Sequence, residues 1–458
     1  MTGLAERAAA WLAELRCEDL PADIVADAKL RILDTLGLIL GATASPIGRA
    51  VRAGALAMGQ GDEARMLGYG DRTTAMAAAL VNGTLAHAAD FDDTHNRSVM
   101  HASAPTVATA MALIGPCALS GRELIAVVAG GIELNCRLGM VTPGAFHRSG
   151  FHPTGVIGAL VAAMMAGRLY GLAPRVTASA VGIAGSQAAG LLEAYEDGSW
   201  AKTLHPGWAG HCGIAAALLA RAGFTGPASV LEGRFGVYRA HVQDPRTPIE
   251  LTRITDRLGT QWEARENSFK PYPCAHAIHP FIDAAIGLHA GGLRAAQIDR
   301  VSLPLSPYLM PVIAEPRAAK LRPVTPTHAR ASLAFCVAAA LVHGRFDETL
   351  LDDAALADSA VLELAGRIDC VPDPSPPPSG QFRGIVEVAT RDGRRVAGRL
   401  DHNRGSRENP MSRAELEAKF RAGAAVVFDA ARADAIIAAI DGLEAAGDAA
   451  ALVRLCVP

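Results

Sequence analysis

Four short polar segments hold most of the side chains in this sequence that could do chemistry. They lie between long apolar stretches, at residues 90–101, 147–155, 202–213 and 269–280. They contain most of the 14 histidines and two of only five lysines in the chain. Lysine can change its protonation state when buried, whereas arginine practically cannot, so a retained lysine is a candidate functional group. Loops rich in His, Asp and Lys between apolar helices are typical places for convergent polar groups.

The first segment places three carboxylates within four residues. Asp90, Asp92 and Asp93 repel one another unless hydrogen bonds, a cation or a metal stabilise them. The Asp/His mixture raises a metal hypothesis, but the spacing matches no H-E-x-x-H or EF-hand pattern. The alternative is a helix end capped by aspartates. Arg97 and His101 follow in the same segment.

The second segment centres on His152, which stands directly before Pro153. The proline disfavours helix at His152 and can begin the next helix. The free backbone N–H groups of that helix end would suit a substrate carboxylate. The alternative is a solvent-exposed histidine in a turn.

The third and fourth segments each place a lysine beside prolines. Lys202 precedes the turn-forming pair Pro206 and Gly207, and would suit a carboxylate clamp or a general acid. Lys270 opens a stiff run with two prolines, which suits the positioning of a charged group. Cys274 near His276 suggests a thiol nucleophile, but no oxyanion-hole or nucleophile-elbow signature accompanies it.

The cations in these segments outnumber what a neutral substrate needs. We therefore expect a small molecule with several negative charges, together with a histidine or lysine that moves a proton. Proton abstraction beside a carboxylate and β-elimination fit without a cofactor. The sequence contains no P-loop, no G-x-S-x-G and no dinucleotide fingerprint. The candidate residues are His101, His152, His276, Lys202, Lys270, Arg97 and the Asp90 cluster.

The composition excludes several classes of protein. The chain has 458 residues, of which 50% are hydrophobic and 19% charged, so it can bury a large core and is not a disordered protein. A net charge of −3 gives no whole-chain attraction to nucleic acid or an anionic membrane. Eight scattered cysteines without a C-x-x-C pair favour reduced thiols in a cytosolic protein. The first residues do not resemble a signal peptide, and no stretch is a convincing membrane-spanning helix.

Long Ala/Leu/Val stretches predict a helical bundle up to about residue 265. Strand patterns follow at 298–305, 367–371, 385–390 and 394–400, the last two around an Asp392-Gly393 turn. Ser412 and Glu415 form a capping box that opens a helix. The predicted fold is mainly α, with an all-helical domain at 1–267 and 401–458 and a smaller α+β domain at 268–400. The C-terminal helices thus return to the helical domain.

Six motifs occur in a family order along the chain. They are DFDDT at 90–94, FHPTG at 151–155, HPGWAGHCGI at 205–214, KPYP at 270–273, HPFIDA at 279–284 and ENPMS at 408–412. With them the sequence resembles the MmgE/PrpD family, that of 2-methylcitrate dehydratase. The resemblance implies a large helical domain, a smaller lid domain, a homodimer, and no metal or redox cofactor. Members include 2-methylcitrate dehydratases, cis-aconitate decarboxylases and iminodisuccinate epimerases.

The resemblance also assigns residues. Asp90 and Thr94 match active-site positions of the family's first loop. The family's histidines and lysines fall on His101, His152, Lys202 and Lys270. His276 lies about one position from a decarboxylase histidine. Phe335 stands where many members have a tyrosine, whose hydroxyl could donate to an oxyanion or move a proton.

These observations lead to an expected activity. We expect a cofactor-independent lyase, similar to 2-methylcitrate dehydratase, on a small di- or tricarboxylate in the cytoplasm. His152 would take the α-proton, while Asp90 and Thr94 orient it or the leaving group. Lys202 and His101 would hold carboxylates, and the expected substrate contacts are Lys270, Arg97, His276 and Phe335. The alternatives are an iminodisuccinate-like epimerase, a cis-aconitate-type decarboxylase and a non-catalytic carboxylate-binding protein.

Overall fold

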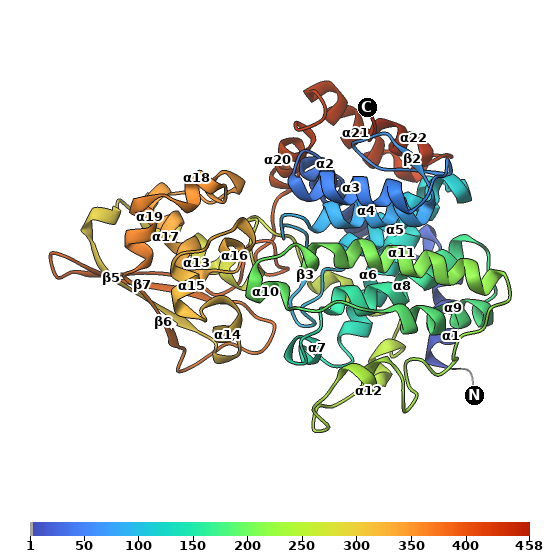
Figure 1. The fold of residues 1–458 in the computed structure, drawn as a ribbon, viewed down its shortest axis with the longest axis horizontal. Helices are drawn as coiled ribbons and strands as arrows, with labels where there is room; N and C mark the ends of the chain where they lie inside the picture. Colours follow the sequence, from blue (N-terminus) through green and yellow to red (C-terminus); the bar gives the residue numbers. More distant parts are fainter. Residues whose placement is uncertain (1–2) are drawn as a thin grey trace. The chain divides into compact units, whose positions relative to one another are not determined.

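A computed structural model describes residues 3–458 and divides into two compact units (Figure 1). The first unit holds the described residues up to Leu192, together with Ala201–Asn267 and Ser412–Pro458. The second unit holds Glu193–Trp200 and Ser268–Met411. The fold is 57% helical and 8% strand, which confirms the prediction of a mainly α protein with a smaller α+β part.

The first unit is a bundle of helices with three two-residue strands. Its helices are α1 (Leu4–Glu14), α2 (Ala22–Ala42), α3 (Pro46–Met58), α4 (Ala75–His87), α5 (Ser103–Cys117), α6 (Gly121–Gly139), α7 (Ala145–Arg148), α8 (Pro153–Leu169), α9 (Pro174–Gln187), α11 (Ala201–Arg221), α12 (Val237–His241), α20 (Arg413–Ala424), α21 (Ala430–Asp441) and α22 (Ala450–Leu455). Its strands are β1 (Ala64–Arg65), β2 (Arg72–Thr73) and β3 (Thr94–His95). The chain leaves this unit at β4 (Asn267–Ser268).

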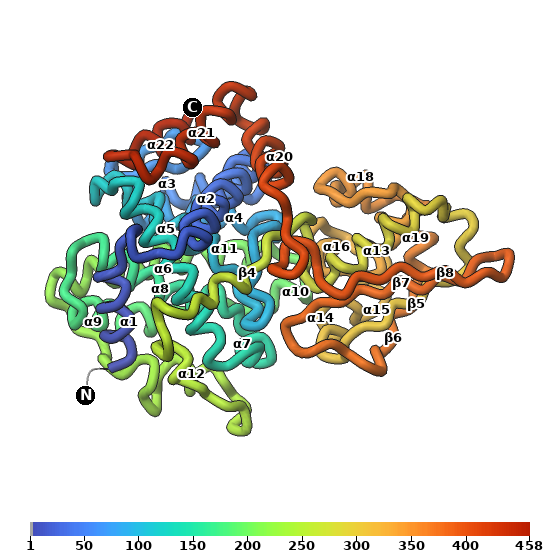
Figure 2. The backbone as a smooth tube through the Cα atoms, turned by 180° about the vertical axis from the view of Figure 1, so that it is seen from behind, coloured from blue at the N-terminus to red at the C-terminus, as the bar shows by residue number. Residues whose placement is uncertain are grey.

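The C-terminal helices pack on the N-terminal ones within this unit. Ser412 caps α20, and Glu415 returns the bond in the predicted capping box. A Cβ at Gly37 of α2 would lie 2.8 Å from Phe420 Cα, and one at Gly423 would lie 2.0 Å from Gly37 O. Glycine is therefore required where α2 and α20 cross. Figures 1 and 2 both show α20 to α22, in red, beside α2 and α3, in blue.

Apolar helices form the core of the unit. α4, α5 and α8 are buried along almost their whole length. Among residues 3–458, no single helix is both long and apolar enough to cross a membrane. Within the described part of the chain, one bent pair, α2 and α3 at 91° to each other, has the length and composition when the two helices are taken together.

A second close crossing joins α4 to α11. A Cβ at Gly83 would lie 2.6 Å from Gly207 Cα, and one at Gly207 would lie 2.1 Å from Leu80 O. The two backbones touch because neither residue has a side chain. His87 lies one turn after Gly83, and Lys202 lies shortly before Gly207, so the crossing brings these two side chains together.

The second unit contains a four-stranded sheet in the order β6-β5-β7-β8. β5 (Ile298–Leu305) is parallel to β6 (Ile368–Pro372) and antiparallel to β7 (Gly384–Thr390). β8 (Arg395–Leu400) completes the hairpin predicted around Asp392-Gly393, and Gly393 has φ +87°. The helices are α10 (Ala194–Asp197), α13 (His279–Ala290), α14 (Met310–Ile313), α15 (Arg317–Leu321), α16 (Pro326–Arg330), α17 (Leu333–His343), α18 (Asp353–Leu356) and α19 (Ser359–Ala365).

Candidate active site

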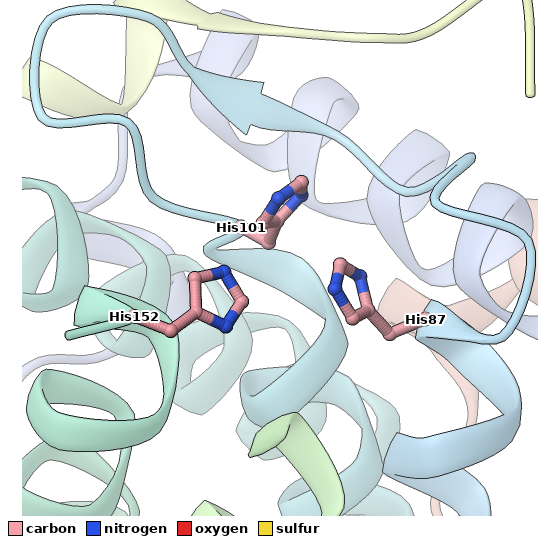
Figure 3. A group of neighbouring side chains, drawn as sticks. All are labelled: His87, His101 and His152. Atoms are coloured by element: carbon pink, nitrogen blue, oxygen red, sulfur yellow. The ribbon is translucent and has the colours of Figure 1, made fainter. Parts of the chain in front are cut away.

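Three of the four predicted polar segments meet in the first unit. His87 ends α4, His101 comes just before α5, His152 precedes Pro153 at the start of α8, and Lys202 lies in the first turn of α11. The three imidazoles face one another (Figure 3). Their ring centroids are 4.5 Å apart for His87 and His101, and 5.5 Å apart for each pair with His152. We call His87, Asp90, Asp92, His101, His152 and Lys202 the histidine cluster.

Charged side chains contact both ring nitrogens of His87. Nδ1 donates to Asp92 Oδ1 at 2.7 Å, and Nε2 accepts from Lys202 Nζ at 2.8 Å. This assignment follows because a carboxylate only accepts and an ammonium only donates. Lys202 Nζ also lies 3.3 Å from Asp90 Oδ2. Aspartate, histidine, lysine and aspartate thus form a continuous chain of hydrogen bonds and ion pairs in which a proton can move.

The neighbouring carboxylate of Asp93 has a different environment. It accepts from Arg31 Nη1 at 3.2 Å, from Asn267 Nδ2 at 2.7 Å and from the backbone N–H of Ser103 at 3.1 Å. All these groups are buried. Asp93 therefore ties the loop to α2 and α5, while Asp90 and Asp92 face the histidines. Hydrogen bonds and cations thus relieve the repulsion that the sequence implied.

Asp90 has an unusual backbone conformation. Its φ is +49°, in the left-handed region that a short polar residue such as aspartate tolerates. Its backbone N–H donates to His87 O at 3.1 Å and closes the turn after α4. This turn directs the Asp90 carboxylate to Lys202.

His152 is fully buried, which overturns the alternative of a solvent-exposed histidine. Burial, with the Lys202 charge as the second cause, holds the pKa of His152 well below its usual range. Its Nδ1 lies 3.0 Å from His205 Nδ1, whereas its Nε2 is buried with no hydrogen-bond partner. His152 is therefore a neutral imidazole with an available nitrogen.

Two other histidines around His152 are also neutral. Burial lowers the pKa of His205 to about 3 and that of His147 to about 4. Their ring centroids lie 5.2 and 6.0 Å from that of His152. Two of the rings near the base candidate thus stay uncharged at neutral pH.

The cluster has donor types that a transition metal accepts. The nitrogens of His87, His101 and His152 lie within 4.8 Å of one another, as do donors of His87, Asp90, Asp92 and His101. Lys202, however, donates to His87 Nε2 and places a positive charge among these donors. Because a bound metal would have to displace that ammonium, the arrangement favours a lysine cation over a metal cation here.

Thr94 and Arg97, the other predicted residues of the first unit, have different contacts. Thr94 Oγ1 is 3.5 Å from His101 Nδ1, whereas Arg97 Nη1 pairs with Glu263 at 2.9 Å. Lys270, His276 and Phe335 belong to the second unit. There His276 Nε2 contacts Asn403 Nδ2 at 2.7 Å, and Phe335 is buried in the apolar core.

His87 and His205 were not among the candidate residues singled out from the sequence. His87 precedes Asp90 by three residues, and His205 follows Lys202 by three, so each shares a helical face or turn with a residue that was singled out. That spacing was a signal for both residues. What distinguishes them from the other histidines is the crossing of α4 and α11, which is visible in the folded structure and not in the sequence.

The fold and the cluster together define a class of protein. A largely helical scaffold places a neutral histidine beside a second histidine that contacts an ammonium and a carboxylate, which is the equipment of general acid–base chemistry on an anionic substrate. The chain belongs to the MmgE/PrpD family. Residues 6–250 match the MmgE/PrpD N-terminal domain and residues 272–445 match the MmgE/PrpD C-terminal domain, which confirms the resemblance seen in the motifs.

Several named relatives are similar over most of the chain. The cis-aconitate decarboxylase-like protein oryM of Aspergillus oryzae is 28% identical over 97% of this chain and 95% of its own. A cis-aconitate decarboxylase of Aspergillus terreus is 25% identical over 99% of this chain and 96% of its own. The human cis-aconitate decarboxylase is 28% identical over 82% of this chain and 78% of its own.

Proposed function

We propose that this protein is a lyase on a small di- or tricarboxylate, and that its reaction is a dehydration like that of 2-methylcitrate dehydratase. The observation that carries the proposal is the neutral His152, whose buried Nε2 has no partner and faces a cluster that contains the Lys202 ammonium. The relatives are named as decarboxylases, which are also lyases on carboxylates.

The chemistry begins with proton transfer. His152 Nε2 takes the proton from the carbon next to a carboxylate, and the electron pair of that C–H bond moves towards the carboxylate. The Lys202 ammonium stabilises the charge that develops there. The pair then forms the double bond as the hydroxyl on the next carbon leaves. A proton from another group of the cluster converts the leaving hydroxide to water. The proton taken up by His152 then returns to that group, so the cluster regains its starting protonation state.

A second candidate reaction is decarboxylation of a cis-aconitate-type substrate, which the names of the relatives favour. In that case the breaking C–C bond supplies the electron pair, carbon dioxide leaves, and an acid in the cluster protonates the carbanion. An iminodisuccinate-like epimerase would use the same carbanion and return the proton to the other face. The three reactions share the cluster and differ in what leaves.

The deciding experiment is proton NMR of the protein in D₂O with 2-methylcitrate, citrate, cis-aconitate and iminodisuccinate. A vinylic signal from 2-methylcitrate supports the dehydratase, itaconate from cis-aconitate supports the decarboxylase, and deuterium uptake alone supports the epimerase. Ligand-induced stabilisation without any exchange would instead favour a carboxylate-binding protein. His152→Gln should lower the observed rate about 10²–10⁴-fold.

The remaining expectations are part of the same proposal. Lys270, Arg97, His276 and Phe335 are proposed to contact substrate, so Lys270→Met should raise KM more than it lowers kcat. The proposed homodimer and cytoplasmic location are tested by light scattering and by cell fractionation.

A further inference from the structure

The contact between His152 and His205 constrains where their protons lie. Nδ1 of one ring is 3.0 Å from Nδ1 of the other. Each neutral imidazole carries one N–H, so one Nδ1 must donate while the other accepts. The donor's remaining nitrogen, Nε2, then has a lone pair.

We propose that His205 is a positioning residue, which holds His152 as the tautomer protonated at Nδ1 and thereby points a lone pair on Nε2 at the cluster. The tautomer itself is independent of the reaction. Its use as a base rests on the function proposed above.

The unpartnered Nε2 of His152 favours this direction of the hydrogen bond. In the opposite arrangement Nε2 would carry the proton, and a buried N–H would have no acceptor. Buried N–H groups without partners are rarer than under-satisfied acceptors. A lone pair on Nε2 avoids that cost.

The charge of Lys202 favours the same direction. It is the second cause of the low His152 pKa, so its field reaches the ring. The His152 ring lies beside those of His87 and His101, with ring centroids 5.5 Å away in both cases (Figure 3), and Lys202 Nζ is hydrogen bonded to His87. The negative end of the imidazole dipole is stabilised towards a positive charge, whereas an N–H there is destabilised.

The Nδ1 atom of His205 is suited to accept the hydrogen bond from His152 Nδ1 and not to donate one. Burial lowers its pKa to about 3, so it remains neutral at physiological pH. A protonated His205 would have to donate from Nδ1 and would impose the opposite tautomer on His152.

Close packing fixes the two rings against each other. His152 N donates to Gly190 O at 2.8 Å, and a Cβ at Gly190 would lie 3.3 Å from His205 Nδ1. Gly190 has φ +147°, a conformation that other residues rarely adopt. A Cβ at Gly155 would lie 2.3 Å from Ala189 O and 3.2 Å from His205 Cβ. The segment before α10 thus lies against both histidines without a side chain between them.

The direct test is long-range ¹H–¹⁵N correlation on the full chain with ¹⁵N-labelled histidine rings, assigned with His152→Gln. We expect Nδ1 of His152 to be protonated and Nε2 to be of the unprotonated type. In His205→Phe, which has no acceptor, that preference should be lost. A protonated Nε2 in the unaltered protein, or an unchanged His152 in His205→Phe, overturns the proposal. Neither result depends on the substrate. The tautomer proposal can therefore be overturned while the proposed function stands, and the proposed function can fail while the tautomer is as expected.

Kinetics then separate positioning from mere packing. His205→Phe should lower kcat about 10²–10⁴-fold with KM nearly unchanged, because the wrong tautomer has no lone pair for the proton. His205→Asn, whose carbonyl can accept from Nδ1–H, should recover most of that loss. His211→Phe, on the same helix and stacked on Trp208 at 5.0 Å, is the matched control and should keep full turnover. Equal losses in His205→Asn and His205→Phe would contradict the role.

Discussion

Asp92 and Asp93 are adjacent in the sequence but belong to two different charge networks. Asp92 bonds to His87, which in turn contacts Lys202, while Asp93 bonds to Arg31 and to amide groups. Histidine and lysine can gain or lose a proton, whereas arginine remains charged and offers a rigid set of donors. The first network is therefore equipped to move protons, and the second to hold the loop in place. Substitutions should separate the two functions.

The largest effect is expected at Lys202. Lys202→Met removes the ammonium from His87 and Asp90 but keeps much of the side-chain volume. Turnover should fall about 10²–10⁴-fold, because charge that develops on the substrate loses its counter-ion. Steady-state kinetics with the substrate identified by NMR measure this loss.

Two variants sharpen that result. Lys202→Arg keeps the charge but cannot give up a proton. Normal turnover in Lys202→Arg would therefore mean that Lys202 acts only through its positive charge. Lys29→Met removes a lysine that bonds Glu444 at the surface, and it should leave turnover unchanged. A Lys202→Met protein with normal turnover would remove the cluster from the reaction.

Arg31 should affect stability instead. Arg31→Met leaves the buried carboxylate of Asp93 without its guanidinium, and breaking a buried pair in this way costs about 3–5 kcal/mol of unfolding free energy. Denaturant unfolding measures the loss. Arg413→Met, which breaks a half-exposed pair with Asp441, should cost less than about 1 kcal/mol. Equal losses in the two variants would mean that the Asp93 network does not hold the loop.

The neutral rings near His152 predict a dependence of stability on pH. Burial lowers the pKa of His147 to about 4 in the folded protein, against about 6.5 for an unperturbed histidine. At a pH between these two values the unfolded chain binds more protons than the folded protein. The contribution of His147 to the free energy of unfolding is therefore fully present above pH 6.5 and declines as the pH falls towards 4. His147→Gln should make the decline shallower, by up to about 1.4 kcal/mol per pH unit. Parallel curves for the two proteins would contradict the lowered pKa of His147.

Much of the fold was predictable because its signals are local. The Ser412–Glu415 capping box and the Asp392-Gly393 turn depend on residues within three or four positions, and the structure contains both. Pro153 likewise marks the start of α8 and the place of His152. Such signals fix where elements begin and end.

The sequence could not predict which aspartate joins the proton-moving network and which holds the loop, because that depends on contacts between residues distant in sequence. Asp93 is assigned to the scaffold by Arg31 and Asn267, which are 62 and 174 residues away. His87 joins the cluster only because Gly83 and Gly207 let two helices touch. The guanidinium of Arg97, a proposed substrate contact, pairs with Glu263, 166 residues further on. Nothing near these residues in the sequence indicates those partners.

Thr94 should show the smallest effect, although motif matching places it in the active site. Its Oγ1 is 3.5 Å from His101 Nδ1, at the limit of a hydrogen bond, while the same nitrogen lies 2.9 Å from Asp93 O. The Nδ1 proton of His101 is therefore already donated to a carbonyl, and Thr94→Val should lower kcat by less than about tenfold. Thr154→Val is the informative partner, because Thr154 Oγ1 accepts from the His101 backbone at 3.0 Å. A larger loss in Thr154→Val than in Thr94→Val would mean that the backbone anchor, and not the Thr94 hydroxyl, positions His101. The reverse order would assign Thr94 a direct part in handling the substrate.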